Sequence, residues 1–123
     1  MEDNQALLYR HIHPSFIIED KVSSQAFTPT RKDNDHLSTY DGDLITPLES
    51  FTHYTESLSL KSSGVMGVMP SECTQEKLNI KYDRVPFTEH VSIDFAALSK
   101  GEKKKAAKKL SIVAIDRGWI YKK

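Results

Sequence analysis

Residues 90–122 read HVSIDFAALSKGEKKKAAKKLSIVAIDRGWIYK, and this stretch decides the fold. Its first residues alternate between apolar and polar, which predicts a strand with Val91, Ile93 and Phe95 on one face. A long helix should follow, and residues 119–122 are rich in strand formers. Strand, helix and strand in this order outline a βαβ unit, although the sequence does not say whether the strands are parallel neighbours.

The long helix is predicted from about 100 to about 117. Ser99 and Glu102 form a capping box at its start, and Gly118 is a stop signal at its end. Its apolar stripe consists of Ala106, Ala107, Leu110, Val113 and Ala114. Ile112 and Ile115 fall on the opposite, lysine-rich half one turn later. We therefore expect the second half of this helix to be covered on both sides.

A second helix is predicted from about 47 to about 60. Thr46 is its cap, Pro47 suits its first position, and Glu49 completes a capping box. One face of this helix carries Leu48, Phe51, Tyr54, Thr55 and Leu58. The side chains expected to point toward water are Glu49, His53 and Glu56.

Shorter elements complete the outline. Residues 6–13 predict a first strand that Pro14 stops, and residues 65–69 predict a short central strand. The other expectations are that 16–22 extend the first strand or pair with it, 23–27 are weakly strand-like, 28–36 form a polar loop, 41–43 form a turn, and 70–77 form a loop or one helical turn. The predicted fold is a single compact α+β domain over residues 1–123, a mixed sheet with two main helices at about 47–60 and 100–117.

Charge is unevenly distributed along a chain whose formal net charge is zero. Residues 1–95 hold 8 Lys and Arg against 15 Asp and Glu, whereas residues 96–123 hold 9 against 2. The single cysteine, Cys73, excludes an internal disulfide and a thiolate zinc site. The sequence shows neither a secretory leader nor an apolar run of about 20 residues, so we expect a soluble cytoplasmic protein.

The basic helix is the predicted binding surface. Its central lysines are Lys104, Lys105, Lys108 and Lys109. The leading hypothesis is a non-enzymatic binding or accessory protein that contacts a protein partner here, because patterned charge suits a protein better than a uniform polyanion. A homo-oligomer is a second form of this hypothesis. Nucleic acid is disfavoured by the acidic remainder of the chain, and a merely solvated helix face is the structural alternative.

Histidines supply weak candidates for chemistry. His11 and His13 leave the same face of the predicted first strand, as metal ligands can, and a third ligand would come from His36, Glu72, His90 or Asp94. His90, Ser92 and Asp94 share a strand face, where an imidazole and a carboxylate provide an acid and a base. Satisfied core histidines and a polar strand face that meets water are the alternatives.

Two further side chains are notable. Cys73 follows the short central strand and is a possible nucleophile or an inert buried thiol. Arg10, inside the first strand, either grips a phosphate or carboxylate or pairs internally with Glu19, Asp83 or Asp94.

The rival hypothesis is a small hydrolase or transferase. Its pocket would gather His11, His13, Cys73, His90 and Asp94. Because a glycine-rich phosphate loop, a nucleophile elbow, an HExxH motif and an EF-hand loop are all missing from the sequence, no cofactor is expected.

Several short motifs are distributed over most of the chain. They include residues 11–16 (HIHPSF), 23–27 (SSQAF), 37–43 (LSTYDGD), 67–73 (GVMPSEC), 90–95 (HVSIDF) and 117–119 (RGW). This pattern resembles a family of uncharacterised bacterial proteins of about the same length. The resemblance implies a bacterial, cytosolic, single-domain protein and carries over no functional residue.

Overall fold

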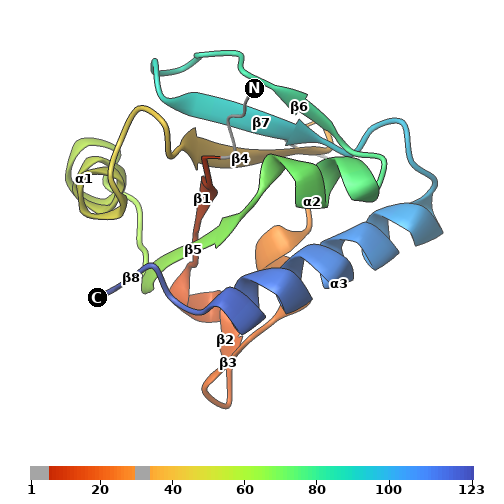
Figure 1. The fold of residues 1–123 in the computed structure, drawn as a ribbon. Helices are drawn as coiled ribbons and strands as arrows, with labels where there is room; N and C mark the ends of the chain where they lie inside the picture. Colours follow the sequence, from red (N-terminus) through yellow and green to blue (C-terminus); the bar gives the residue numbers. More distant parts are fainter. Residues whose placement is uncertain (1–5, 30–33) are drawn as a thin grey trace.

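The computed structural model describes residues 6–29 and 34–123 (Figure 1). Within these ranges the chain forms a six-stranded sheet in the order β6-β7-β4-β1-β5-β8. The strands are β1 (Leu8–His11), β4 (His36–Asp41), β5 (Gly64–Val68), β6 (Asn79–Lys81), β7 (His90–Asp94) and β8 (Tyr121–Lys122). The predicted α+β class is confirmed.

The sheet expected to be mixed is antiparallel at each of its pairings. Because every neighbouring pair is antiparallel, β7 and β8 run in the same direction, with β4, β1 and β5 between them. The predicted strand–helix–strand unit is therefore present as a long crossover. A separate hairpin joins β2 (Ile17–Ile18) to β3 (Lys21–Val22), so residues 16–22 pair with themselves and not with the first strand.

The crossover helix α3 (Lys100–Arg117) has the predicted bounds and the predicted capping box. Gly118 ends it at φ 91°, a backbone conformation that glycine adopts without a steric penalty. Four stripe residues are buried, namely Ala106, Ala107, Leu110 and Ala114. The prediction for Ile112 and Ile115 is wrong, since they are 53% and 46% exposed. The sheet lies on one side of α3, and no other described layer covers its outer face (Figure 1).

The second helix is shorter than predicted. The α-helical part, α1 (Pro47–Thr52), continues as a π-helical turn, η4 (His53–Ser57), in which the Leu58 amide bonds to the His53 carbonyl. A π-helical turn closes with an i→i+5 hydrogen bond and so contains more residues than an α-helical turn. Residues that would share one face at α-helical spacing therefore do not share it after Thr52. Leu48 is 55% exposed and Leu58 is 37% exposed, whereas Phe51 and Tyr54 pack inward. His53 also turns inward, against the expectation that it meets water.

Several short segments differ from their predictions, and for others the structure decides between two predicted alternatives. Residues 23–27 were expected to be strand-like but form a 3-10 helix, η2 (Ser24–Phe27), because the Ser23 side chain caps the Gln25 amide. Residues 70–77 adopt the helical alternative as α2 (Pro70–Gln75), and β5 is a buried interior strand as predicted. The loop expected at 28–36 includes residues 30–33, which lie outside the described ranges, and its last residue already begins β4.

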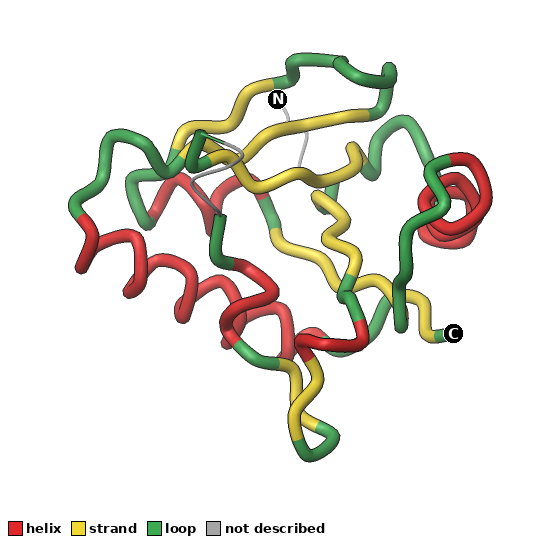
Figure 2. The backbone as a smooth tube through the Cα atoms, turned by 180° about the vertical axis from the view of Figure 1, so that it is seen from behind, coloured by secondary structure: helices red, strands yellow, loops and turns green. Residues whose placement is uncertain are grey.

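The sheet has two differently covered faces. On one face α3, α2 and η2 enclose the main core, which includes Phe27, Phe95 and Leu110. On the other side of the sheet lie α1 and η4, away from α3 (Figure 2). A smaller, aromatic cluster around Tyr40 packs there. A further 3-10 turn, η1 (Pro14–Phe16), follows β1. None of the described helices combines the length and the apolarity that crossing a membrane requires.

Candidate active site

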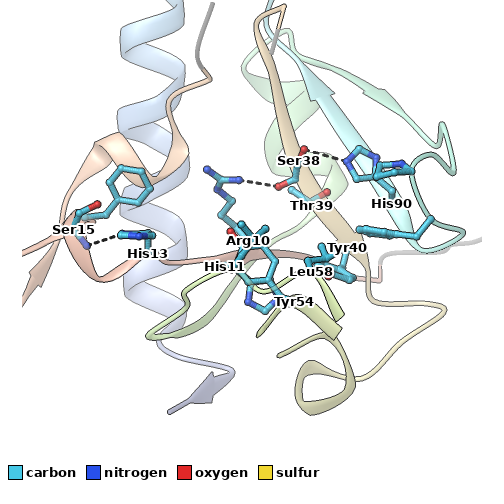
Figure 3. A pocket seen from close by; sticks show the side chains of 14 residues that line it. Arg10, His11, His13, Ser15, Ser38, Thr39, Tyr40, Tyr54, Leu58 and His90 are labelled. Carbon is cyan, nitrogen blue, oxygen red and sulfur yellow. Dashed lines mark hydrogen bonds between the residues drawn. The ribbon is translucent and has the colours of Figure 1, made fainter. Parts of the chain in front are cut away.

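A cavity of about 530 Å³ opens on the face of the sheet opposite α3. Its floor comes from β1, β4 and β7, and its walls come from η1, η4 and the loop between β6 and β7 (Figure 3). The lining residues are Arg10, His11, His13, Ser15, Phe16, Ser38, Thr39, Tyr40, Tyr54, Leu58, Leu60, Pro86, Phe87 and His90. This volume is in the range of about 300–1,000 Å³ that small-molecule sites occupy.

The floor of the cavity is open because β1 and β4 separate. Their pairing includes Leu8 with Asp41 and Tyr9 with Tyr40 but does not extend to Ser38. The Arg10 side chain enters this fork, where Nη1 donates to the Ser38 carbonyl at 3.0 Å and Nε donates to the Ala26 carbonyl at 2.7 Å. Arg10 therefore ties β4 and η2 together through carbonyl oxygens, and these bonds do not go to the acidic partners expected from the sequence.

A chain of hydrogen bonds runs along one end of the cavity. The Ser38 Oγ lies 3.1 Å from His90 Nε2, and His90 Nδ1 lies 2.7 Å from Asp83 Oδ1. Strand register produces the first contact, because Tyr40 faces His90 and Ser38 therefore lies diagonally across from it on the same side of the sheet. Ser38 is exposed at the cavity, whereas His90 is buried.

The loop between β6 and β7 holds Asp83 in place. Asp83 Oδ2 accepts a hydrogen bond of 2.6 Å from Ser92 Oγ, and Arg84 forms a 2.9 Å ion pair with Asp41 on β4. Of the two alternatives for His90 and Ser92, a strand face that merely meets water does not apply, because this loop covers both side chains. A polar strand face is thus buried because it has a carboxylate partner.

Protons can be assigned along this chain. Partial burial opposes ionisation of Asp83, but the hydrogen bonds from Ser92 and His90 outweigh it and lower the pKa of this carboxyl group. An ionised Asp83 can only accept a hydrogen bond, so His90 Nδ1–H is the donor. In the neutral imidazole the lone pair of Nε2 is then directed at the Ser38 hydroxyl. This is the arrangement in which an imidazole can take the proton of a serine nucleophile.

His11 has a structural role beside the cavity. Its Nδ1 lies 3.0 Å from Ser62 Oγ and its Nε2 lies 3.3 Å from Ser50 Oγ, so both ring nitrogens have partners. The ring stacks on Tyr54 with a centroid distance of 4.1 Å. Burial, with the nearby Arg10 charge, lowers the pKa of His11 to about 3. His11 is therefore neutral at ordinary pH and engaged on both edges.

His13 lies beyond the end of β1, at the far end of the cavity from His90 (Figure 3). Its Nδ1 accepts the Ser15 amide at 3.0 Å and caps η1. His11 and His13, the weak metal candidates from strand alternation, do not converge on one point, because they bind different partners. Within the described ranges no three His, Cys, Asp or Glu side chains are grouped so as to hold a metal ion.

The remaining walls are aromatic. Tyr40 stacks on Phe87 with a centroid distance of 4.8 Å, and its hydroxyl lies 2.6 Å from His53 Nδ1. Burial raises the pKa of the Tyr40 hydroxyl well above its usual value, so this side chain stays neutral. Leu58 and Leu60 extend the apolar wall to the exposed rim.

Other residues named from the sequence lie away from the cavity lining. Cys73 is fully buried in the main core, and burial beside Glu72 raises the pKa of its thiol to about 12, so it is an inert thiol. Glu72 binds Arg117 at 2.7 Å, and Asp94 binds Lys81 at 3.1 Å and contacts His36 at 3.4 Å. Of the predicted five-residue cluster, His11, His13 and His90 line the cavity, while Cys73 and Asp94 do not.

The predicted binding lysines lie on the other side of the sheet. Lys104, Lys105, Lys108 and Lys109 are exposed on the outer face of α3. None of them forms an ion pair with a residue in the described part of the chain, unlike Lys103, whose Nζ lies 3.1 Å from Asp35. The lysine surface and the cavity are therefore separate places on the molecule.

Sequence reasoning named His90 as a candidate but missed Ser38, and it named Asp83 only as a possible partner of Arg10. The Ser38 contact spans 52 positions and depends on strand register, which no local pattern revealed, since β4 itself was not predicted. Asp83 is only seven positions from His90, and an acid just before a short loop into a polar strand face was the available signal. Comparison of the chain with protein-family models, curated proteins and solved structures found no match.

Proposed function

We propose that this protein is a serine hydrolase that cleaves carboxylic esters. Ser38 is the nucleophile, His90 is the general base and acid, and Asp83 is a positioning residue that fixes the His90 tautomer. The observation that carries the proposal is the hydrogen-bonded chain from Ser38 Oγ through both His90 nitrogens to Asp83, with Ser38 exposed in the cavity. The proposal keeps the hydrolase alternative but replaces the predicted Cys73 and Asp94 by Ser38 and Asp83.

The reaction follows from the proton positions. The Ser38 oxygen forms a bond to the ester carbonyl carbon while its proton moves to His90 Nε2. The bond from this carbon to the alcohol oxygen then breaks, and His90 returns the proton to the departing alcohol. A water molecule attacks the acyl-serine, gives a proton to His90, and releases the acid as Ser38 recovers its proton. The net reaction consumes one ester and one water and forms one acid and one alcohol.

Charge near Ser38 favours this reaction. The Asp83 carboxylate stabilises the imidazolium that forms when His90 takes the proton. The Arg10 guanidinium donates to the Ser38 carbonyl at 3.0 Å and so helps to hold the strand segment that carries the nucleophile.

The test is hydrolysis of p-nitrophenyl butyrate by matched variants. Ser38→Ala should lower kcat/KM by about 10³-fold or more, as removal of an activated nucleophile does. Ser15→Ala is the control, because it removes another exposed hydroxyl from the opposite end of the same cavity and should leave the rate unchanged. Equal rates for Ser38→Ala and Ser15→Ala would refute the proposal.

Asp83→Asn tests the positioning role separately. Because the imidazolium then lacks its carboxylate, kcat should fall while KM stays nearly unchanged. A rise in KM that accounts for the whole loss of kcat/KM would mean that Asp83 only holds the loop.

A protein partner on the outer face of α3 is the second candidate function. The observation in its favour is that four exposed lysines without ion pairs in the described chain adjoin exposed Ile112 and Ile115. Its test is the mass in solution at low and high salt, for the protein and for a variant with all four lysines changed to Glu. A salt-sensitive dimer that the variant lacks supports self-association through this face, whereas retention on heparin supports nucleic acid instead. The cytoplasmic location stays a prediction.

A further inference from the structure

The cavity changes character with distance from Ser38. Next to Ser38 it carries the polar chain of His90 and Asp83, whereas the wall formed by η4 and the following residues is apolar. This wall is built from Tyr54, Leu58 and Leu60, and Phe87 with Pro86 faces it from the loop before β7. A substrate held with its carbonyl at Ser38 would place its substituents along these side chains.

Leu58 and Leu60 are exposed at the cavity, at 37% and 47%. Their position follows from the π-helical turn, since the Leu58 amide bonds to the His53 carbonyl and the Leu60 amide bonds to the Tyr54 carbonyl. The turn takes these leucines off the inward face of the helix and places them at the cavity. An apolar ligand that covers these two side chains removes their surface from water, which makes binding more favourable.

The aromatic part of the wall is fixed in place. Tyr54 is stacked on His11, Tyr40 is stacked on Phe87, and the Tyr40 hydroxyl is bound to His53. Both tyrosine rings therefore present a preformed apolar surface, and binding costs little side-chain entropy.

We infer that the substrates are esters whose acyl group is a medium-length alkyl chain, an inference that rests on the proposed hydrolase function. The carbonyl lies at Ser38, and the chain lies along Tyr54 toward Leu58 and Leu60. Acetyl esters reach Ser38 but leave the leucine rim uncovered, so they are the poorer substrates.

The experiment compares p-nitrophenyl acetate, butyrate and hexanoate. Burying one methylene is worth a factor of about 2 to 4 at a half-open wall, so kcat/KM should rise roughly 15- to 250-fold over the four methylenes that separate acetate from hexanoate. The variant Leu58→Ser with Leu60→Ser should lose most of this gain, measured within the variant as the ratio of kcat/KM for hexanoate to kcat/KM for acetate. Leu48→Ser is the matched control, because Leu48 is an exposed leucine of α1 that does not line the cavity, and it should keep the full gain.

Binding to the Ser38→Ala variant separates this inference from the hydrolase proposal. The two esters, acetate and hexanoate, are titrated into Ser38→Ala at pH 6 and followed by calorimetry. The apolar acyl site is supported if Ser38→Ala binds the hexanoate more tightly than the acetate and the added double leucine change abolishes this difference. This result supports the acyl site even if wild-type turnover does not depend on Ser38. Equal binding of both esters, or a hexanoate preference that survives the leucine changes, overturns the inference whatever the status of the nucleophile.

Discussion

The two faces of the sheet bury different chemistry. On the α3 face the helix contributes small and aliphatic side chains such as Ala106 and Leu110, and the core behind them is apolar. On the cavity face the buried set includes His11, Ser50 and His90, each held by a hydrogen bond from another part of the chain.

The two faces differ in what burial contributes to the fold. Apolar burial stabilises the fold without directional requirements, whereas a buried polar group costs free energy unless its partners are in place. A protein that needed only a stable sheet could cover both faces with apolar side chains. The polar network on the cavity face therefore marks the part of the molecule in which chemistry is expected.

The largest effect on stability should come from the α3 face. Leu110→Ala removes a side chain that is 1% exposed and should lower the free energy of unfolding by about 2–5 kcal/mol. Ile112→Ala, two positions along on the exposed face, should change it by no more than about 0.5 kcal/mol. Urea denaturation measures both. Similar losses for the two variants would mean that α3 is covered on both faces after all.

Acid should act on the cavity face first. Burial lowers the pKa of His11 to about 3, so the unfolded chain takes up this proton before the folded chain does. The resulting stability is complete above about pH 6.5 and is lost as pH falls toward 3. Between pH 7.5 and 5 the loss should be about 2 kcal/mol, while the lowered pKa values of Asp83 and Asp94 act only at lower pH.

The control for this acid effect is another histidine of the same cavity. His11→Asn should flatten the dependence of the unfolding free energy on pH between 7.5 and 5, and His13→Asn should leave it steep because His11 remains. A flat wild-type profile would show that His11 is not held neutral by burial.

The helix cap on the α3 face should have a smaller, local effect. Ser99 Oγ accepts the Glu102 amide at 3.2 Å, and Ser99→Ala should lower the free energy of unfolding by about 1 kcal/mol. Ser57→Ala, at an exposed position of η4, should cost less than about 0.5 kcal/mol. Thermal unfolding of the two variants decides the order, which would be reversed if the cap were frayed.

The exposed lysines should have the smallest effect. Lys104 with Lys108 and Lys105 with Lys109 are like-charged pairs one turn apart, so changing all four to Gln should raise stability by about 0.2–0.5 kcal/mol per pair at low salt and by less at high salt. Lys103→Gln is the contrasting variant, because it removes the ion pair with Asp35 and should not stabilise. A loss of stability in the fourfold variant would indicate that these lysines have partners within the fold.

The same contrast explains what the sequence could predict. The bounds of α3 and its buried stripe depend on neighbours one turn apart, so Ser99, Glu102 and Gly118 were sufficient to place it. Exposure of Ile112 and Ile115 was missed because periodicity does not reveal how many layers pack on a helix. The turn after Thr52 was missed because a π turn has no distinct local signal here.

Most of the cavity could not be predicted from local sequence patterns. His90 was named as a candidate, but its partners are set by the register of β4 against β7 and by the loop that carries Asp83. Asp94 was grouped with it by strand alternation and Cys73 by residue type, and the sheet separates Cys73 from the cavity. Other contacts are as distant in sequence, such as that between His11 and Ser62, which spans 51 positions.

Covalent labelling tests the central claim most directly. In a reaction with diisopropyl fluorophosphate, Ser38 Oγ would form a bond to phosphorus and fluoride would leave, with the serine proton passing to His90. Mass spectrometry of the digested protein should then locate a single adduct on the peptide that contains Ser38. The adduct should be absent in Ser38→Ala, strongly reduced in His90→Gln and unchanged in Ser15→Ala. An unlabelled wild-type protein, or an adduct that persists in Ser38→Ala, would contradict the assignment of Ser38 as the nucleophile.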